Sequence, residues 1–299
     1  MASEWMGEPI AQVEGPDDAA RQLAERDRLR DRTDSLEPPR AYAVLKMWTE
    51  LAAVIQLGAI ALVFSAASAD GSEVLQPSIF ALIILTVTGN PVLEGAKERF
   101  RVRSRKTSAM AWLAIGIGAC TVAASMVASL ADLVMPWWIA VVATSAMVAL
   151  TLPVSLLQVM RASPAPATAR RELRLDRPVR ITTIGLAAVL GLMTACIGIG
   201  IDSVVGASLS LLGSASVVVA AIASLAARGS GFGPHRMGYL WGTPQWTAFG
   251  ICTTLVVTTV ILRAFTTVVG PTSGIAAGVI VASLLIVAAF LPTTRRAEE

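Results

Sequence analysis

Eight long apolar stretches constrain this chain more than any other feature of its sequence. The hydrocarbon core of a bilayer is about 30 Å thick, so a helix needs about 20 apolar residues to cross it. Only 15% of the 299 residues are charged, whereas soluble domains carry about 25%. We therefore expect an all-α integral membrane protein with eight transmembrane helices, placed near 46–67, 77–95, 109–131, 136–159, 181–201, 207–227, 244–265 and 273–292.

The basic residues lie on one side of this alternating topology. Every strongly basic segment falls on the side that also holds the N-terminus, and the opposite loops contain almost no Lys or Arg; the basic segments are 21–46, 97–106, 161–180, 228–236 and 295–296. Cytoplasmic loops carry the excess of Lys and Arg in membrane proteins. The pattern predicts a plasma (inner) membrane protein with both termini in the cytoplasm.

Several short sequences of the first half recur in the second half, at nearly the same displacement. Leu51-Ala-Ala-Val54 returns as Leu186-Ala-Ala-Val189, and the W-x-A-x-G-I sequence at Trp112 returns at Trp246. Such echoes indicate an internal duplication. Because each copy holds four helices, both enter the membrane in the same direction, as two tandem parallel repeats. The expected organisation is a polar cytoplasmic segment with a helix (1–45), a first repeat (46–160), a linker (161–180) and a second repeat with a short tail (181–299).

The polar N-terminal segment contains a charged helical run at 19–32. One interpretation is a solvated helix without a partner, and the other is a docking helix for a cytosolic partner or an anionic lipid surface. The second interpretation nominates the arginines of this helix and of the first basic loop, namely Arg26, Arg30, Arg101, Arg103 and Arg105.

Ionisable groups inside a membrane are functional candidates because burying them is costly. Glu50 and Gln56 lie in the first apolar stretch, and Lys46 precedes Glu50 by one helical turn, an i,i+4 spacing that lets the two pair on one helix face. Glu50 is therefore either an interfacial ion-pair partner or the carboxylate of a substrate path.

The second polar candidate is the run Thr86 to Pro91. Pro91 lacks an N–H and can free a backbone carbonyl near Val87, beside Asn90. The alternative is a helix that ends at Gly-Asn-Pro. Asn90 enters from the same side as Glu50, so we expect Glu50 and Asn90 to share one polar site, with Gln56 and Thr86 along the same path.

No catalytic, cofactor or metal site is expected. The three cysteines, Cys120, Cys196 and Cys252, fall in apolar stretches, where a thiol behaves as a small hydrophobe. His235, in a Gly-rich loop, has no second metal-ligating residue nearby and is expected to be solvent-exposed. Asp202 and Arg263 lie near outer ends of the second repeat, where they either face each other or reach water independently.

Two functions remain. One is a transporter for an apolar, zwitterionic or lipid-like substrate, with a path between the repeats near the bilayer midplane. The other is a non-catalytic scaffold or complex subunit that docks a cytosolic or membrane protein through its N-terminal helix and basic loops, with self-association also open. An enzyme and a nucleic-acid partner are not expected. A cavity that reaches Glu50 favours transport, and a solidly packed bundle favours a scaffold.

Overall fold

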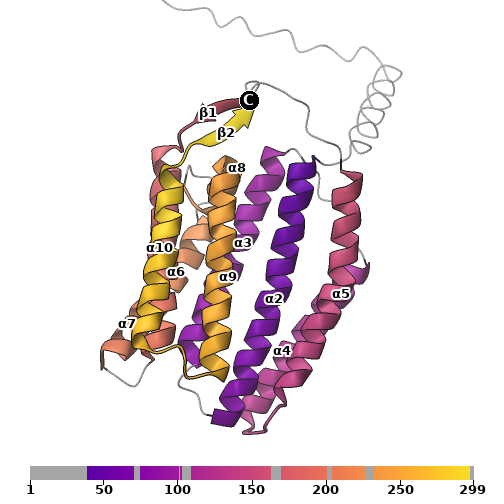
Figure 1. Cartoon of the computed structure of the whole chain (residues 1–299), viewed down its shortest axis with the longest axis vertical. Helices are drawn as coiled ribbons and strands as arrows, with labels where there is room; N and C mark the ends of the chain where they lie inside the picture. The colour runs from indigo at the N-terminus through magenta and orange to yellow at the C-terminus, as the bar shows by residue number, and fades with distance from the viewer. Residues whose placement is uncertain are drawn as a thin grey trace, which may run out of the picture. The chain divides into compact units, whose positions relative to one another are not determined.

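The computed structural model describes residues 39–70, 75–100, 102, 109–162, 170–200, 204–226 and 232–296. This part of the chain is a helical bundle with one short two-stranded ribbon (Figure 1). The helices are α2 (Arg40–Asp70), α3 (Leu75–Arg99), α4 (Ala109–Leu130), α5 (Trp137–Arg161), α6 (Arg177–Ile199), α7 (Val204–Ala226), α8 (Pro234–Leu240), α9 (Thr243–Phe265) and α10 (Pro271–Phe290); the strands are β1 (Arg170–Leu173) and β2 (Thr293–Arg296).

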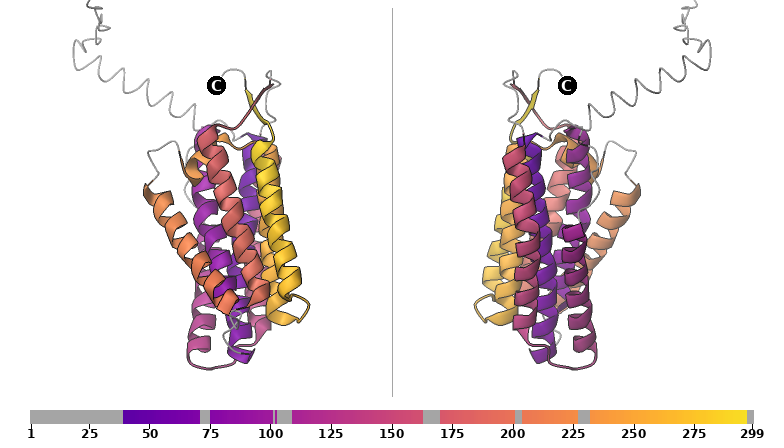
Figure 2. Two further views of the ribbon diagram at one scale, coloured as in Figure 1. Left: turned by 90° about the vertical axis from the view of Figure 1, so that its left-hand side faces the viewer. Right: turned by 90° about the vertical axis from the view of Figure 1, so that its right-hand side faces the viewer.

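All eight apolar stretches form helices. Seven helices in the described residues, α2, α3, α4, α5, α6, α9 and α10, are long and apolar enough to cross a membrane. The helix α7 contributes a shorter apolar segment, Gly206–Val219, and it is tilted so that its C-terminal end stands away from the neighbouring helices (Figure 2). The protein is therefore an α-helical, polytopic membrane protein.

The two halves of the bundle have similar internal neighbours. In the first half α2 packs along α5 and contacts α4 and α3, and in the second half α6 packs along α10 and contacts α9 and α7. Small residues allow the closest approach, as expected for membrane helices: a Cβ on Gly198 would lie 2.5 Å from the Cα of Gly274, and one on Gly278 would lie 2.4 Å from the carbonyl oxygen of Gly191. The interior where the halves meet is filled by fully buried side chains, including Leu82, Leu85, Leu190, Met193 and Val260.

Prolines set several helix starts. The carbonyl oxygen of Pro39 accepts hydrogen bonds from the N–H groups of Tyr42 and Ala43, so α2 begins at Arg40, well before the predicted span. Proline lies in the first turn of α6, α9 and α10, where its missing N–H costs nothing and its fixed φ suits a helix.

The linker between the halves is more ordered than the sequence suggests. Residues 170–173 form β1, which pairs antiparallel with β2 after α10, and Arg170 and Arg171 lie opposite Arg296 and Arg295. Leu175, in the same linker, is buried. The linker and the C-terminal segment therefore meet at one end of the bundle. The candidate docking residues Arg26, Arg30, Arg101, Arg103 and Arg105 lie outside the described residues, as does the predicted N-terminal helix.

Candidate functional site

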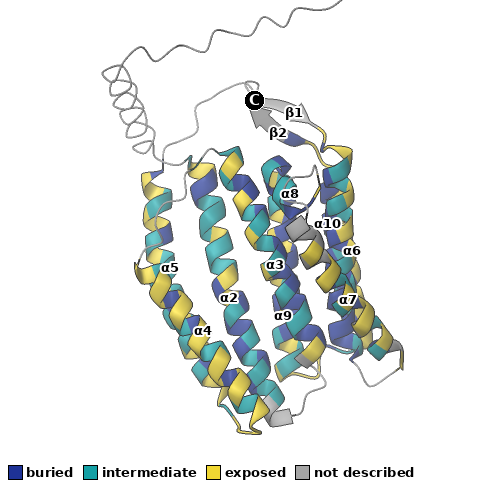
Figure 3. Cartoon of the chain, turned by 180° about the vertical axis from the view of Figure 1, so that it is seen from behind, coloured by how far each residue is buried: buried dark blue, intermediate teal, exposed yellow. Residues whose placement is uncertain are grey.

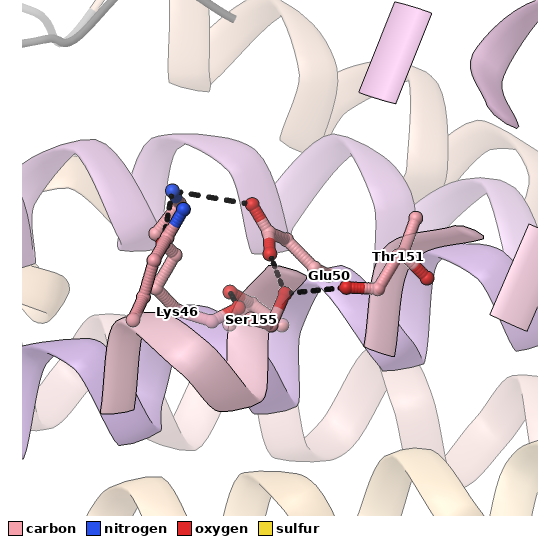
Figure 4. A network of polar contacts seen from close by, with 6 residues as sticks. Lys46, Glu50, Thr151 and Ser155 are labelled. Atoms are coloured by element: carbon pink, nitrogen blue, oxygen red, sulfur yellow. Dashed lines mark hydrogen bonds and ion pairs between the residues drawn. The ribbon is translucent and has the colours of Figure 1, made fainter. Parts of the chain in front are cut away.

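Glu50 belongs to a polar network that joins α2 to α5 (Figure 4). Lys46 Nζ lies 3.5 Å from Glu50 Oε1, which confirms the predicted i,i+4 ion pair. The Ser155 hydroxyl donates a 2.6 Å hydrogen bond to Glu50 Oε2, and Lys46 Nζ donates to Gln158 Oε1 at 2.9 Å. Both carboxylate oxygens of Glu50 thus have partners, and the network links two packed helices.

Gln56 belongs to a different contact, between α2 and α3. The Gln56 side chain is buried, and its Oε1 accepts a 3.1 Å hydrogen bond from the Thr86 hydroxyl, which also lies 3.0 Å from the Leu82 carbonyl oxygen. Among the described contacts, none joins Glu50 to Asn90. The structure thus divides the polar site expected from the sequence between two helix contacts, one on each side of α2.

A backbone carbonyl freed near Val87 by Pro91 stays a prediction, whereas the alternative of a helix that ends at Gly-Asn-Pro is wrong, because α3 does not end there. It continues through Pro91 to Arg99. The physical reason is the close contact of its last turns with α8. A Cβ on Gly95 would lie 1.9 Å from the His235 carbonyl oxygen, and one on Gly238 would lie 1.7 Å from the Val92 carbonyl oxygen. The backbones touch, and this support holds α3 helical beyond the proline.

We call this contact the α8 clasp: α8 and Trp241 held against Gly95, Glu98 and Arg99 of α3. His235 Nε2 lies 3.3 Å from Glu98 Oε1, and an Arg99 guanidinium nitrogen donates to the Trp241 carbonyl oxygen. The expectation of a loop at His235 is wrong, because His235 lies in the first turn of α8, which begins at Pro234 and packs on α3, and its side chain is partly exposed. Pro234, in the first turn of α8 after Gly233, is the sequence signal that could have indicated this helix.

Trp241, the last residue of the α8 clasp, is fully buried, a feature that was not predicted from the sequence. Its indole N–H donates to the Thr183 hydroxyl at 3.2 Å. Nearby, the buried Gln245 accepts from the Gly242 N–H at 2.9 Å and donates to the carbonyl oxygens of Ala288 and Leu291 at 2.9 and 3.0 Å. These hydrogen bonds give partners to two carbonyl groups at the C-terminal end of α10. The end of the bundle near Arg99 is therefore tightly packed.

One row of polar side chains on α3 faces outward. Thr86, Asn90, Glu94 and Glu98 recur at i,i+4 spacing and all of them are exposed; we call them the polar stripe. Side chains at this spacing lie on the same side of a helix, and Figure 3 looks onto the side of the bundle where α3 lies between α2 and α7. Asn90 and Glu94 have no side-chain partner among the described residues, in contrast to Glu50 and Gln56.

The stripe reaches deep into the span. With about 1.5 Å of rise per residue, Asn90 lies roughly 5 Å and Glu94 roughly 10 Å along the axis from the midpoint of α3. The half-thickness of a hydrocarbon core is about 15 Å, so both residues fall inside it when the midpoint of α3 lies at the midplane. Glu98 then lies at the interface. Polar groups at this depth normally face a bundle interior or a water-filled cavity, so their outward position requires an explanation.

The other candidate features are less informative. A hollow of about 340 Å³ lies on the outer face of α5 and does not include Glu50; it is lined by Thr144, Ser145, Val148, Ala149, Leu152 and Pro153. Within the described residues, no group of three His, Cys, Asp or Glu side chains is placed to hold a metal ion. Asp202 lies outside the described residues, so its contact with Arg263 stays a prediction.

Comparison of the chain with protein-family models, with curated proteins and with solved structures finds no match.

Proposed function

We propose that this protein is a transporter for an amphipathic, lipid-like substrate. The polar part of the substrate follows the polar stripe on α3 while its apolar part stays in the bilayer. The observation that carries this proposal is the exposure of Asn90 and Glu94, without partners among the described residues, inside a candidate membrane span.

The cost of the arrangement supports a functional role. An ionised side chain at the centre of a membrane helix costs about 2.5–3.5 kcal/mol on translocon-based scales. The cost of placing Glu50 in the membrane is offset by its ion pair with Lys46 and by the hydrogen bond from Ser155. The cost for Gln56 is offset by the hydrogen bond that it accepts from Thr86. Asn90 and Glu94 lack such partners in the described chain, so a polar substrate group and the water that accompanies it supply the missing interactions.

The location of the path is also constrained by the interior. Leu82, Leu85, Leu190 and Met193 are fully buried where an enclosed channel between the halves would run, and the hollow on α5 does not reach Glu50. By the criterion stated from the sequence, this packing counts against an enclosed path near the midplane and in favour of the scaffold. A path along the membrane-facing side of α3 needs no opening through this interior. The helix α3 itself adjoins the second proposed repeat, because it contacts α6 and α7.

The proposed architecture has eight crossings and two parallel repeats, and paired contacts between helices support the duplication. Gly118 on α4 would meet the Met147 sulfur on α5 if it carried a Cβ. At the displacement that separates Trp112 from Trp246, Gly118 corresponds to Cys252 on α9 and Met147 to Val281 on α10. These two counterparts also meet, because the Cys252 thiol donates to the Val281 carbonyl oxygen. We further propose that the protein lies in the plasma (inner) membrane, with the Arg99 end of α3 on the cytoplasmic side. We also propose that no chemical reaction accompanies transport.

A lipid-translocation assay tests the proposal. The purified chain is reconstituted into liposomes that contain tail-labelled fluorescent phospholipid, and dithionite added outside bleaches the label that reaches the outer leaflet. Asn90→Leu and Glu94→Leu should each lower the bleaching rate of the slow phase at least about tenfold, whereas Thr254→Val, at an exposed position on α9, should not. Wild-type liposomes that bleach no further than protein-free liposomes would refute transport of lipid-like substrates.

The scaffold hypothesis is retained as a second candidate because of one observation, the pairing of β1 with β2. This ribbon brings Arg170 and Arg171 opposite Arg296 and Arg295, which collects basic residues from two distant parts of the chain. An acidic cytosolic protein would complement this charge. Replacing all four arginines by glutamine should remove such a protein from the purified complex, and an unchanged set of co-purifying proteins would eliminate this candidate.

A further inference from the structure

We infer that the head group carried along α3 is zwitterionic, with a cationic nitrogen and a phosphate; this inference rests on the proposed transport function. It deepens that proposal by naming the chemistry that the path recognises. The observation behind it is a pair of opposite charges on the outward side of α3, Glu94 and Lys97, neither of which has an ion-pair partner among the described residues.

The two charged residues share one side of the helix. Glu94 and Lys97 are three residues apart, and side chains at this i,i+3 spacing are neighbours on a helix surface. Both lie near the C-terminal end of α3, which ends at Arg99. Glu94 is exposed and Lys97 is half-buried. The nitrogen and oxygen atoms of this pair are not within ion-pair distance, unlike those of Lys46 and Glu50, which lie 3.5 Å apart. Both charges are therefore available to a ligand.

The neighbouring charges are already engaged. Glu98 lies beside His235 in the α8 clasp, and Arg99 donates to the Trp241 carbonyl oxygen while its guanidinium lies 5.7 Å from the centre of the Phe100 ring. Glu94 and Lys97 are thus the two charges on this part of α3 that remain for a substrate. Asn90 lies deeper in the membrane than Glu94. Its side-chain amide is both a hydrogen-bond donor and an acceptor, so it can bind either the ammonium or the phosphate of the substrate.

The order of the charges matches a head group that enters with its nitrogen first. Lys97 lies roughly 15 Å from the midpoint of α3, at the edge of the hydrocarbon core, and Glu94 lies about one helical turn deeper. A head group that bends from the near leaflet into the membrane leads with its terminal ammonium and is followed by its phosphate. The ammonium then meets Glu94 while the phosphate meets Lys97, over an axial separation of about 4.5 Å.

Other head groups fit this pair less well. An anionic head group without a nitrogen leaves the Glu94 carboxylate facing another negative charge in a medium that screens poorly. An uncharged substrate offers a charged partner to neither side chain. A zwitterionic head group is the class that satisfies both residues together, and its net neutrality also lowers the cost of moving it across the core.

The experiment compares two tail-labelled probes in the liposome assay, phosphatidylcholine and phosphatidylglycerol, with the full-length chain. The wild-type protein should move phosphatidylcholine at least about fivefold faster than phosphatidylglycerol. Glu94→Gln should reduce the phosphatidylcholine rate about tenfold and the phosphatidylglycerol rate by clearly less, so that the preference for phosphatidylcholine is lost. Glu94→Asp, which keeps the charge, should retain the preference and serves as the control for correct folding, together with an unchanged elution volume in size-exclusion chromatography.

The outcomes separate the two proposals. Equal wild-type rates for both probes, or an equal loss of both rates in Glu94→Gln, would overturn the zwitterionic head group and leave transport in place. No movement of either probe above protein-free liposomes would overturn transport itself, and the head-group inference with it.

Discussion

The α8 clasp makes a quantitative prediction, because α3 and α8 meet through glycine. In Gly95→Ala the new Cβ would lie 1.9 Å from the His235 carbonyl oxygen and 2.8 Å from the Tyr239 nitrogen, well inside the ordinary contact distance of about 3.5–4.0 Å. These neighbours are backbone atoms, so α8 must move away by roughly 1.5–2 Å to restore that contact distance. Overpacking of this kind costs about 1–3 kcal/mol, and the greater helix propensity of Ala offsets about 0.5–1 kcal/mol.

Gly89→Ala is the matched control, because it lies in the same helix and has nothing within 4 Å of the new Cβ. Its free energy of unfolding should change only through the greater helix propensity of Ala. The two variants should therefore differ by about 1–3 kcal/mol in free energy of unfolding. Titration with SDS in mixed micelles measures this difference, with the total tryptophan emission of the chain as the signal, to which the buried Trp241 contributes. Equal midpoints for Gly95→Ala and Gly89→Ala would show that the two helix backbones are not in contact, and the account of α3 beyond Pro91 would fail with it.

Three further predictions concern the bundle as a whole. Gln245→Leu leaves the Leu291 carbonyl oxygen and the Gly242 N–H without their partner, while the Ala288 carbonyl oxygen still accepts from the Leu291 N–H. Thermal denaturation should therefore show a loss of about 2–6 kcal/mol, at roughly 1–3 kcal/mol for each of the two unsatisfied groups; wild-type stability would contradict this. Glu50→Gln removes the charge that faces Lys46, and it should lower stability by about 1 kcal/mol while lipid translocation in liposomes stays unchanged; lost translocation at full stability would return Glu50 to the substrate path. A cysteine introduced at Thr272 should react with an impermeant maleimide added to intact cells, and one at Ser104 should not; the reverse result would refute the proposed orientation.

Much of the helical architecture could be predicted from the sequence, because long apolar stretches leave few alternatives in a bilayer. The eight stretches all form helices, and Gly274 and Gly278 lie against Gly198 and Gly191, as small residues do where membrane helices pack closely. The helix ends were less predictable. Pro91 has the sequence signature of a helix end, yet tertiary contact with α8 overrides it.

The candidate site was predictable only where its contacts are local. The Lys46–Glu50 pair follows from i,i+4 spacing on one helix, whereas Ser155 is far from Glu50 in the sequence and no local pattern connects them. Thr86 and Asn90 were identified from the polar run that ends at Pro91, and their regular spacing with Glu94 was visible in the sequence. Their exposure was not predictable, because the direction that a side of α3 faces depends on how α2, α7 and α8 pack around it.

The distribution of polar residues between the proposed repeats bears on where a substrate moves. At the displacement that separates Trp112 from Trp246, Asn90 corresponds to Ser224 and Glu94 to Arg228, so the second copy does not repeat the chemistry of the polar stripe. A channel on a pseudo-two-fold axis would be lined by equivalent sides of both copies, and it would need polar residues from each. A path on the membrane-facing side of one helix needs only one. Because Ser224 and Arg228 are themselves polar, the distribution of polar residues alone does not decide between the two paths. The interior closed by Leu82, Leu190 and Met193 favours movement along the surface of α3 over movement through the centre of the bundle.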